Sequence, residues 1–151
     1  MTRTSRERRL AGAAAAKGGR GFRIRIIQFI KSAAFNTGEA TAAQRLNIEW
    51  HKSGDGFTWL TRDTKETTAL ACHGWQLAQE KISVGAYDLV VLDEFTYPLR
   101  SGWLSNTEVV DWLSANKPEP LHLIITGRYA PEPLIDYADL VAEMRLIQHP
   151  Y

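Results

Sequence analysis

Short runs of apolar residues alternate along this chain with longer stretches of helical spacing. The clearest run is Leu89–Leu92, four large apolar residues in a row that lead directly into the acids Asp93 and Glu94. A run this short and continuous predicts a strand buried on both faces, as at the centre of a parallel sheet with helices on either side. The other predicted elements are arranged around this strand.

Three other segments predict further strands. Phe22–Ile30 is rich in β-branched residues and half alternating, which indicates a strand that becomes more buried along its length. Leu46–His51 alternates cleanly between apolar and polar residues, as expected for a strand nearer the edge of the sheet. Leu121–Ile125 is apolar apart from one histidine and predicts a second buried strand.

Helices are predicted between these strands. In the helix predicted over Thr61–Val84, Trp75, Ala78 and Ile82 recur with helical spacing and mark its core-facing side. Cys72, in the same helix, is expected to be a small core residue. Shorter helices are predicted in four other places: 5–17, from Thr37 through Gln44, Glu108–Ala115 and Pro131–Ala138.

The alternation of strands and helices with short joints predicts an α/β fold, with a mostly parallel sheet flanked by helices. The length of 151 residues suits one domain with its own core. With 44% hydrophobic and 23% charged residues, the composition is that of an ordinary soluble globular protein. We therefore expect a single domain over residues 1–151.

Charge and cysteine content exclude several classes of protein. The formal net charge of +1 gives no overall field that would attract nucleic acid. No apolar run approaches the roughly 20 residues that span a bilayer, so neither a nucleic acid nor a membrane is expected as a partner. The single cysteine, Cys72, excludes an internal disulfide and a cysteine-cluster metal site, and it suits a reducing cytosol.

Polar groups are expected at one edge of the sheet, because the carboxyl ends of parallel strands meet there and α/β proteins bind ligands beyond those ends. An apolar strand that ends in two acids is the pattern of a Walker B strand, which holds Mg²⁺ beside nucleotide phosphates. The same acids could instead cap a helix or face solvent. Arg128, at the same edge, could bind a phosphate or could be an ordinary solvent-exposed arginine. The segments concerned are Lys31, the loop after His51, Asp93-Glu94 and Thr126-Gly127-Arg128.

Two aromatic residues, Phe57 and Trp59, follow the turn Ser53–Gly56 with no periodic pattern around them. Helix or strand packing does not account for large aromatic side chains at these positions. They are either core residues beneath the loop or a lid that faces a flat, largely apolar ligand.

Five segments together resemble the corrinoid adenosyltransferases of the P-loop class, which move the adenosyl group of ATP onto the cobalt of a reduced corrinoid. An apolar strand that ends in Asp-Glu is common among P-loop proteins, but its combination with the other segments is highly specific. The segments occur in the family's order and spacing and cover residues 13–151. They are Ile26–Lys31, Gly56–Trp59, Val90–Tyr97, Ile124–Arg128, and Ala138–Met144 with His149-Pro150.

The resemblance implies a RecA-like P-loop nucleotide-binding fold and a homodimer. It implies ATP, Mg²⁺ and a corrinoid, either cobalamin or a precursor, as substrates and cofactors. By this similarity Asp93 and Glu94 hold Mg²⁺ and the triphosphate, and Glu94 is also expected to be catalytic. Phe57 and Trp59 are expected to be catalytic because they pack on the lower face of the corrin and displace the axial ligand of cobalt, which makes cob(II) easier to reduce.

The same resemblance implies further substrate contacts and partners. An electron donor for cobalt reduction is expected as a partner, and the cytoplasm as the location. The residues expected to bind ATP or the corrinoid, besides the two aromatic residues, are Lys31, Asn36, Thr58, Thr126 and Arg128.

One part of the chain departs from the family. Its members begin with a strand and a glycine-rich phosphate loop ending in Lys-Thr-Thr, whereas residues 1–12 contain no glycine-rich run and no loop lysine. We therefore expect the first strand and the phosphate cradle to be missing. Family members also usually continue at the C-terminus with a tail that helps complete the active site, and here we expect that tail to be short. Two alternatives fit such a chain. It could be a corrin-binding remnant with impaired catalysis, or it could be another P-loop ATPase, although such an ATPase would not need the aromatic loop.

Overall fold

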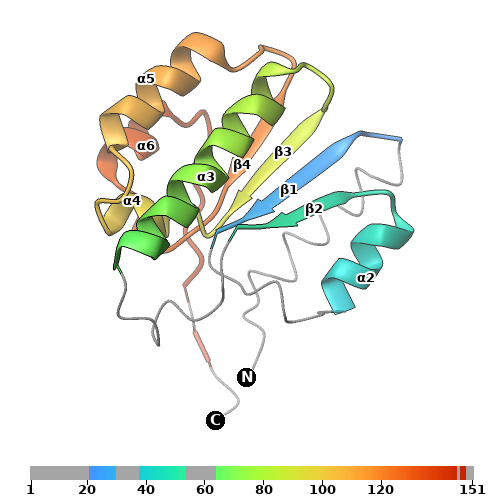
Figure 1. Cartoon of the computed structure of the whole chain (residues 1–151), viewed down its shortest axis with the longest axis horizontal. Coiled ribbons are helices and arrows are strands. Elements are labelled where there is room, and N and C mark those ends of the chain that lie inside the picture. The colour runs from blue at the N-terminus through green and yellow to red at the C-terminus, as the bar shows by residue number, and fades with distance from the viewer. Residues whose placement is uncertain (1–20, 30–37, 54–63, 146, 149–151) are drawn as a thin grey trace.

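Within the residues that the structure describes, four parallel strands form a sheet in the order β2-β1-β3-β4 (Figure 1). The computed structural model describes residues 21–29, 38–53, 64–145 and 147–148. The strands are β1 (Ile24–Gln28), β2 (Glu49–Lys52), β3 (Leu89–Asp93) and β4 (His122–Ile125). The helices are α2 (Gly38–Arg45), α3 (Thr64–Ser83), α4 (Thr96–Arg100), α5 (Asn106–Asn116) and α6 (Glu132–Tyr137). The α/β class, with a parallel sheet flanked by helices, is confirmed.

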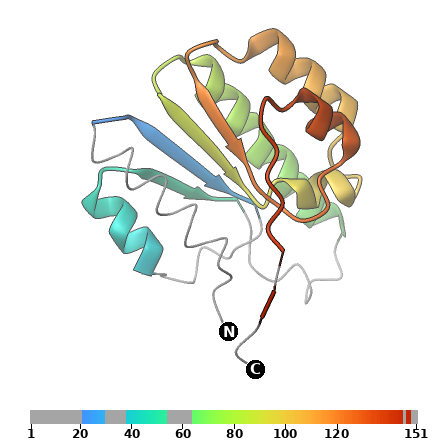
Figure 2. The same ribbon diagram turned by 180° about the vertical axis from the view of Figure 1, so that it is seen from behind.

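The central strand, β3, is buried along its whole length, as predicted. Val90 and Leu92 belong to one apolar core, and Leu89 and Val91 to another, because successive side chains of a strand point to opposite faces of the sheet. Residues of α3, α4, α5 and α6 cover the first core, and α2 contributes to the second (Figure 1, Figure 2). Burial on both faces explains the continuous apolar run before Asp93.

The longest helix, α3, lies within the helix predicted from residue spacing. Trp75, Ala78 and Ile82 are all buried in the first core, so the predicted core-facing side is confirmed. The helix ends just before Gly85, which has a φ of +66°, a conformation that glycine adopts without a steric cost. Cys72 is half-buried and packs against the margin of the core, so it is a peripheral member of that core.

The strands at the two sides of the described sheet differ from the prediction. β4 was expected to be buried, but His122 is exposed and the rest of the strand is half-buried, because β3 is its only hydrogen-bonded neighbour among the described strands. β2 was expected to begin at Leu46, but it begins at Glu49. The residues before it form a turn in which Asn47 has a φ of +54°.

Helix α4 was not predicted. Its single turn begins two residues after Glu94, in a segment for which the sequence predicted neither a helix nor a strand. Phe95 and Leu99 anchor it, since both are buried in the first core, with exposed fractions of 0% and 4%. The turn therefore forms through tertiary packing, which local residue spacing does not reveal.

The remaining helices agree with the prediction apart from their ends. α2 contains Gln44 as expected, and α5 begins earlier than predicted because the Ser105 hydroxyl caps it by accepting from the Glu108 amide. The helix predicted over residues 5–17 lies outside the described residues. No helix in the described ranges is long and apolar enough to cross a membrane.

Candidate functional site

A row of polar residues crosses the sheet at the carboxyl ends of its strands. The backbone register pairs Gln28 with Lys52 on one side and with Asp93 on the other. Thr126 follows the last residue of β4, and its amide donates to the Leu92 carbonyl, so it lies beside Asp93. The row two residues earlier in each strand, on the same face, is apolar: Trp50, Ile26, Val91 and Ile124. The polar row therefore forms the rim of the second core.

Asp93 lies in the middle of this row and is only 8% exposed. Both of its carboxylate oxygens accept hydrogen bonds from neighbouring strands. Gln28 Nε2 donates to Oδ2 at 2.7 Å, and Thr126 Oγ1 donates to Oδ1 at 2.7 Å. A carboxylate offers about four acceptor positions, and the described residues fill two of them.

The hydroxyl of Thr126 connects the two acids. It donates to Asp93, and it accepts from the backbone amide of Glu94 at 3.1 Å. A hydroxyl has one hydrogen and two acceptor positions, so in this arrangement Thr126 has no hydrogen left for a phosphate oxygen. Its second acceptor position suits a cation.

Glu94 follows β3 in the left-handed region, with a φ of +58°, which is uncommon for a residue that has a side chain. Its amide donates to Thr126, and its carbonyl accepts from the Tyr97 amide at 3.2 Å, so hydrogen bonds hold its backbone on both sides. A strained conformation of this kind persists only where the surroundings enforce it, and such residues cluster at functional sites. The turn keeps the second acid at the same edge as the first.

The loop after β4 is fastened to the start of α4. Thr96 Oγ1 donates to the Arg128 carbonyl at 2.9 Å. Gly127 packs so closely that a β-carbon there would lie 1.7 Å from Thr96 Oγ1, which no side chain could tolerate without movement. Beyond it, the Tyr129 ring lies 4.6 Å from the Arg100 guanidinium. These contacts keep the exposed Arg128 near the edge that carries the acids.

The structure thus gathers Asp93, Glu94, Thr126 and Arg128, four of the predicted site residues, although their roles stay predictions. The other predicted site residues lie outside the described residues, and their roles also stay predictions. They are Lys31, Asn36, Phe57, Thr58 and Trp59.

Gln28 was not predicted to be a site residue. It is 3% exposed, and its side chain is bound to the Asp93 carboxylate. The sequence does contain a signal, because Gln28 occupies the same face as Ile24 and Ile26 and is the one polar residue in that series. A polar residue that ends a buried apolar series needs a polar partner.

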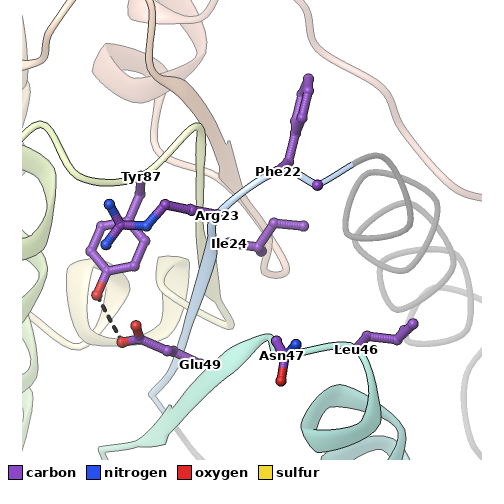
Figure 3. A pocket seen from close by; sticks show the side chains of 8 residues that line it. Phe22, Arg23, Ile24, Leu46, Asn47, Glu49 and Tyr87 are labelled. Atoms are coloured by element: carbon purple, nitrogen blue, oxygen red, sulfur yellow. Dashed lines mark hydrogen bonds between the residues drawn. The ribbon is translucent and has the colours of Figure 1, made fainter.

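A separate pocket of about 230 Å³ lies at the opposite, amino end of β1 (Figure 3). Beside it the Tyr87 hydroxyl donates to Glu49 at 2.7 Å, and Arg25 pairs with the same carboxylate. The hydrogen bond from Tyr87 lowers the pKa of Glu49, while burial raises the pKa of Tyr87. These contacts tie β1, β2 and the chain before β3 together, so we interpret them as structural.

Comparison with known proteins identifies the family. Residues 9–151 match the family described as ATP:corrinoid adenosyltransferase BtuR/CobO/CobP. The chain belongs to this family. The resemblance drawn from the sequence motifs is therefore confirmed.

Three related corrinoid adenosyltransferases show how much of the family this chain covers. It is 40% identical to one from Sinorhizobium sp, over 83% of this chain and 60% of the relative. It is 36% identical to one from Pseudomonas aeruginosa, over 88% of this chain and 66% of the relative. It is 34% identical to the corrinoid adenosyltransferase CobA of Salmonella typhimurium, over 93% of this chain and 70% of the relative. The chain thus spans about two thirds of the length of these relatives.

The acids at the carboxyl edge fit the Mg²⁺ that the resemblance to these adenosyltransferases implies. Mg²⁺ prefers oxygen ligands and is often held by one or two carboxylates, while phosphates and waters complete its shell. Asp93 keeps acceptor positions for such an ion, and Glu94 directly follows it. Within the described ranges, no group of three or more His, Cys, Asp or Glu residues could hold a metal.

Proposed function

We propose that this chain is an ATP:corrinoid adenosyltransferase, which transfers the 5′-deoxyadenosyl group of ATP to the cobalt of a reduced corrinoid and releases triphosphate. Family membership and the names of the relatives support this reaction. The structural observation that carries the proposal is Asp93, a nearly buried carboxylate at the end of the central strand that neighbouring strands orient through both oxygens. A RecA-like P-loop architecture is part of the proposal.

The proposed transfer exchanges one bond at the 5′ carbon of ATP. Reduced cobalt is the nucleophile and forms the cobalt–carbon bond, while the bond from that carbon to the triphosphate oxygen breaks and its electron pair leaves with triphosphate. The leaving group gains negative charge, so cations at its oxygens lower the barrier. Mg²⁺ supplies such charge when bound, and Asp93 and Glu94 would hold it. Arg128 would contribute a second positive group from the same edge.

The remaining predicted site residues have proposed roles around the two substrates. Phe57 and Trp59 would cover the lower face of the corrin and exclude its axial ligand and water. Further contacts to ATP or the corrinoid would come from Lys31, Asn36, Thr58 and Thr126. We also propose a homodimer and an electron donor that reduces cobalt. A cytoplasmic location is proposed as well, since the single cysteine suits a reducing compartment.

One experiment tests the proposed reaction. The purified chain is incubated with ATP, Mg²⁺ and chemically reduced cobalamin, and the cobalt–carbon product is followed by its visible spectrum. We expect product with the native chain and a large loss with Asp93→Asn, which weakens the cation site. Asp111→Asn is the matched control, because Asp111 lies exposed on α5. It should leave the rate unchanged.

The outcomes separate the proposed functions. Corrin binding without product would contradict catalysis and favour the corrin-binding remnant. Phosphate release from ATP without any corrin-dependent product would favour a different ATPase. An equal loss of product in the Asp93 and Asp111 variants would show that Asp93 has no specific role in the reaction, so the proposed cation site would be wrong.

A further inference from the structure

The carboxylate of Asp93 is held from both sides by neutral donors. Gln28 reaches one oxygen from β1, and Thr126 reaches the other from the end of β4. Neutral donors orient a carboxylate without cancelling its charge, whereas an arginine or lysine in either place would form an ion pair with it. These two described neighbours therefore leave the charge of Asp93 available to a cation.

Two hydrogen bonds, one to each oxygen, fix the orientation of the Asp93 carboxylate, whereas a single one would not. A carboxylate bound through a single oxygen can still turn about its terminal bond, because that torsion is broad. Donors on both oxygens, each at 2.7 Å, remove this freedom, and the described part of the chain leaves one acceptor position on each oxygen unfilled. Those two positions are the ones that a bound cation would use.

The position of Gln28 is itself fixed by its surroundings. Its side chain is 3% exposed, and its carbonyl accepts from the Ser53 amide at 2.7 Å. The next residue, Phe29, donates its amide to the Asp93 carbonyl at 3.0 Å. The side-chain amide therefore approaches Asp93 from a rigid strand rather than from a loop.

From this arrangement we infer that Gln28 is a positioning residue that, together with Thr126, orients Asp93 toward a divalent cation. The inference rests on the proposed function, since it concerns the ion that the site would share with ATP. Gln28 does not touch the ion or the reacting atoms. It acts through Asp93, as residues behind the direct ligands of a metal do, and loss of such a residue weakens metal affinity about ten- to hundredfold.

The test measures cation binding directly, without turnover. Mn²⁺ alone is titrated into the purified chain, and free Mn²⁺ is followed by electron paramagnetic resonance. Gln28→Met keeps the length of the side chain but removes the donor, and it should weaken Mn²⁺ binding about tenfold or more. Thr126→Val, which removes the second donor, should weaken it similarly. Gln76→Met is the matched control on the exposed face of α3 and should bind Mn²⁺ as the native chain does.

Thermal unfolding of each variant separates positioning from folding. A purely structural role for Gln28 would lower the melting temperature and leave the Mn²⁺ dissociation constant of the folded protein unchanged, and that result would overturn the inference. No Mn²⁺ binding by the native chain would overturn it too. If Gln28→Met does not fold, Gln28→Asn replaces it, since it keeps the amide but withdraws it from Asp93, and it should show the same weakening.

Failure of this inference and failure of the proposed reaction can be told apart. Adenosyl transfer that proceeds normally, with Mn²⁺ binding unaffected in Gln28→Met, would refute the role of Gln28 and leave the reaction standing. Weakened Mn²⁺ binding in that variant, with no adenosyl product from the native chain, would support the role of Gln28 and refute the reaction.

Discussion

Replacement of Gly127 by alanine should destabilise the protein strongly, because the added methyl group has no space. Its β-carbon would lie 1.7 Å from Thr96 Oγ1, 2.6 Å from Thr96 Cβ and 2.7 Å from Thr96 Cγ2. Rotation of the Thr96 side chain alone cannot relieve contacts this short, since the Thr96 β-carbon, which such a rotation does not move, is among the clashing atoms. The loop after β4 must therefore move away from α4.

The magnitude follows from two losses. Overpacking that forces such a movement typically costs about 1–3 kcal/mol. The movement also breaks the hydrogen bond from Thr96 to the Arg128 carbonyl, which contributes about 1 kcal/mol. We therefore expect Gly127→Ala to lower the free energy of unfolding by about 3 kcal/mol. For a chain of this length, that corresponds to a melting temperature lower by roughly 6–12 °C.

Urea unfolding, followed by circular dichroism, measures this change. Both glycines have a positive φ, +158° at Gly127 and +71° at Gly102, but apart from chain neighbours no atom lies within 4 Å of a methyl group added at Gly102, so Gly102→Ala is the control. The free energy of unfolding of Gly102→Ala should fall only by the cost of placing alanine in the left-handed conformation, about 1 kcal/mol. In the double variant Thr96→Gly with Gly127→Ala, the threonine side chain that clashes with the new methyl group is absent. The double variant should therefore lose less free energy of unfolding than the two single variants together, by about 1 kcal/mol or more.

Two results would refute this reasoning. If Gly127→Ala unfolds at the same urea concentration as the native chain, the close packing of the loop after β4 against α4 is wrong. If it is destabilised only as much as Gly102→Ala, backbone conformation rather than contact with Thr96 sets the cost.

Three further predictions concern the core, the amino end of the sheet and the aromatic loop. Phe95→Ala should lower the free energy of unfolding by about 3–5 kcal/mol in urea titrations, because Phe95 is fully buried in the first core. The hydrogen bond from Tyr87 lowers the pKa of Glu49, so Glu49 stabilises the fold above its unfolded pKa and loses that effect as pH falls through the folded pKa. The stability difference between the native chain and Glu49→Gln in urea should therefore be larger at pH 7 than at pH 3. Replacement of both Phe57 and Trp59 by alanine should reduce turnover from cob(II) far more than from pre-reduced cob(I).

Each of these predictions has a result that would contradict it. For the core, Tyr129→Ala is the control, since that ring is 78% exposed, and equal losses in both variants would count against the packing of Phe95. At the amino end of the sheet, a stability difference that does not change with pH would remove the role of the Glu49 charge. For the aromatic loop, equal losses from both cobalt states would refute the displacement of the axial ligand.

Much of the fold follows from patterns that are local in the sequence. A strand buried on both faces needs an uninterrupted apolar run, and α3 needs apolar residues at helical spacing, so both elements were predictable. The acids Asp93 and Glu94 could be placed at the carboxyl edge because they directly follow the central strand. The motifs also pointed to the family, since they combine segments from most of the chain.

The contacts of the site depend on residues that are distant in sequence. Gln28 lies 65 residues from Asp93, and Thr126 lies 33 residues from it, so only the register of three strands brings them together. The local pattern of apolar and polar residues does not indicate which strands pair with each other. For the same reason α4 was missed, because packing of Phe95 in the core, rather than helical spacing, produces it.

Burial and alternation are properties of neighbouring residues, so the sequence alone indicated a buried strand that ends in two carboxylates at the carboxyl edge of the sheet. The hydrogen-bond partners of the first of those carboxylates depend on the tertiary structure. By placing Gln28 and Thr126 on either side of Asp93, it gives each oxygen one hydrogen bond, fixes the orientation of the carboxylate and leaves its charge uncancelled. Hydrogen bonds act over about 3 Å between specific atoms, so they form only once the strands have paired.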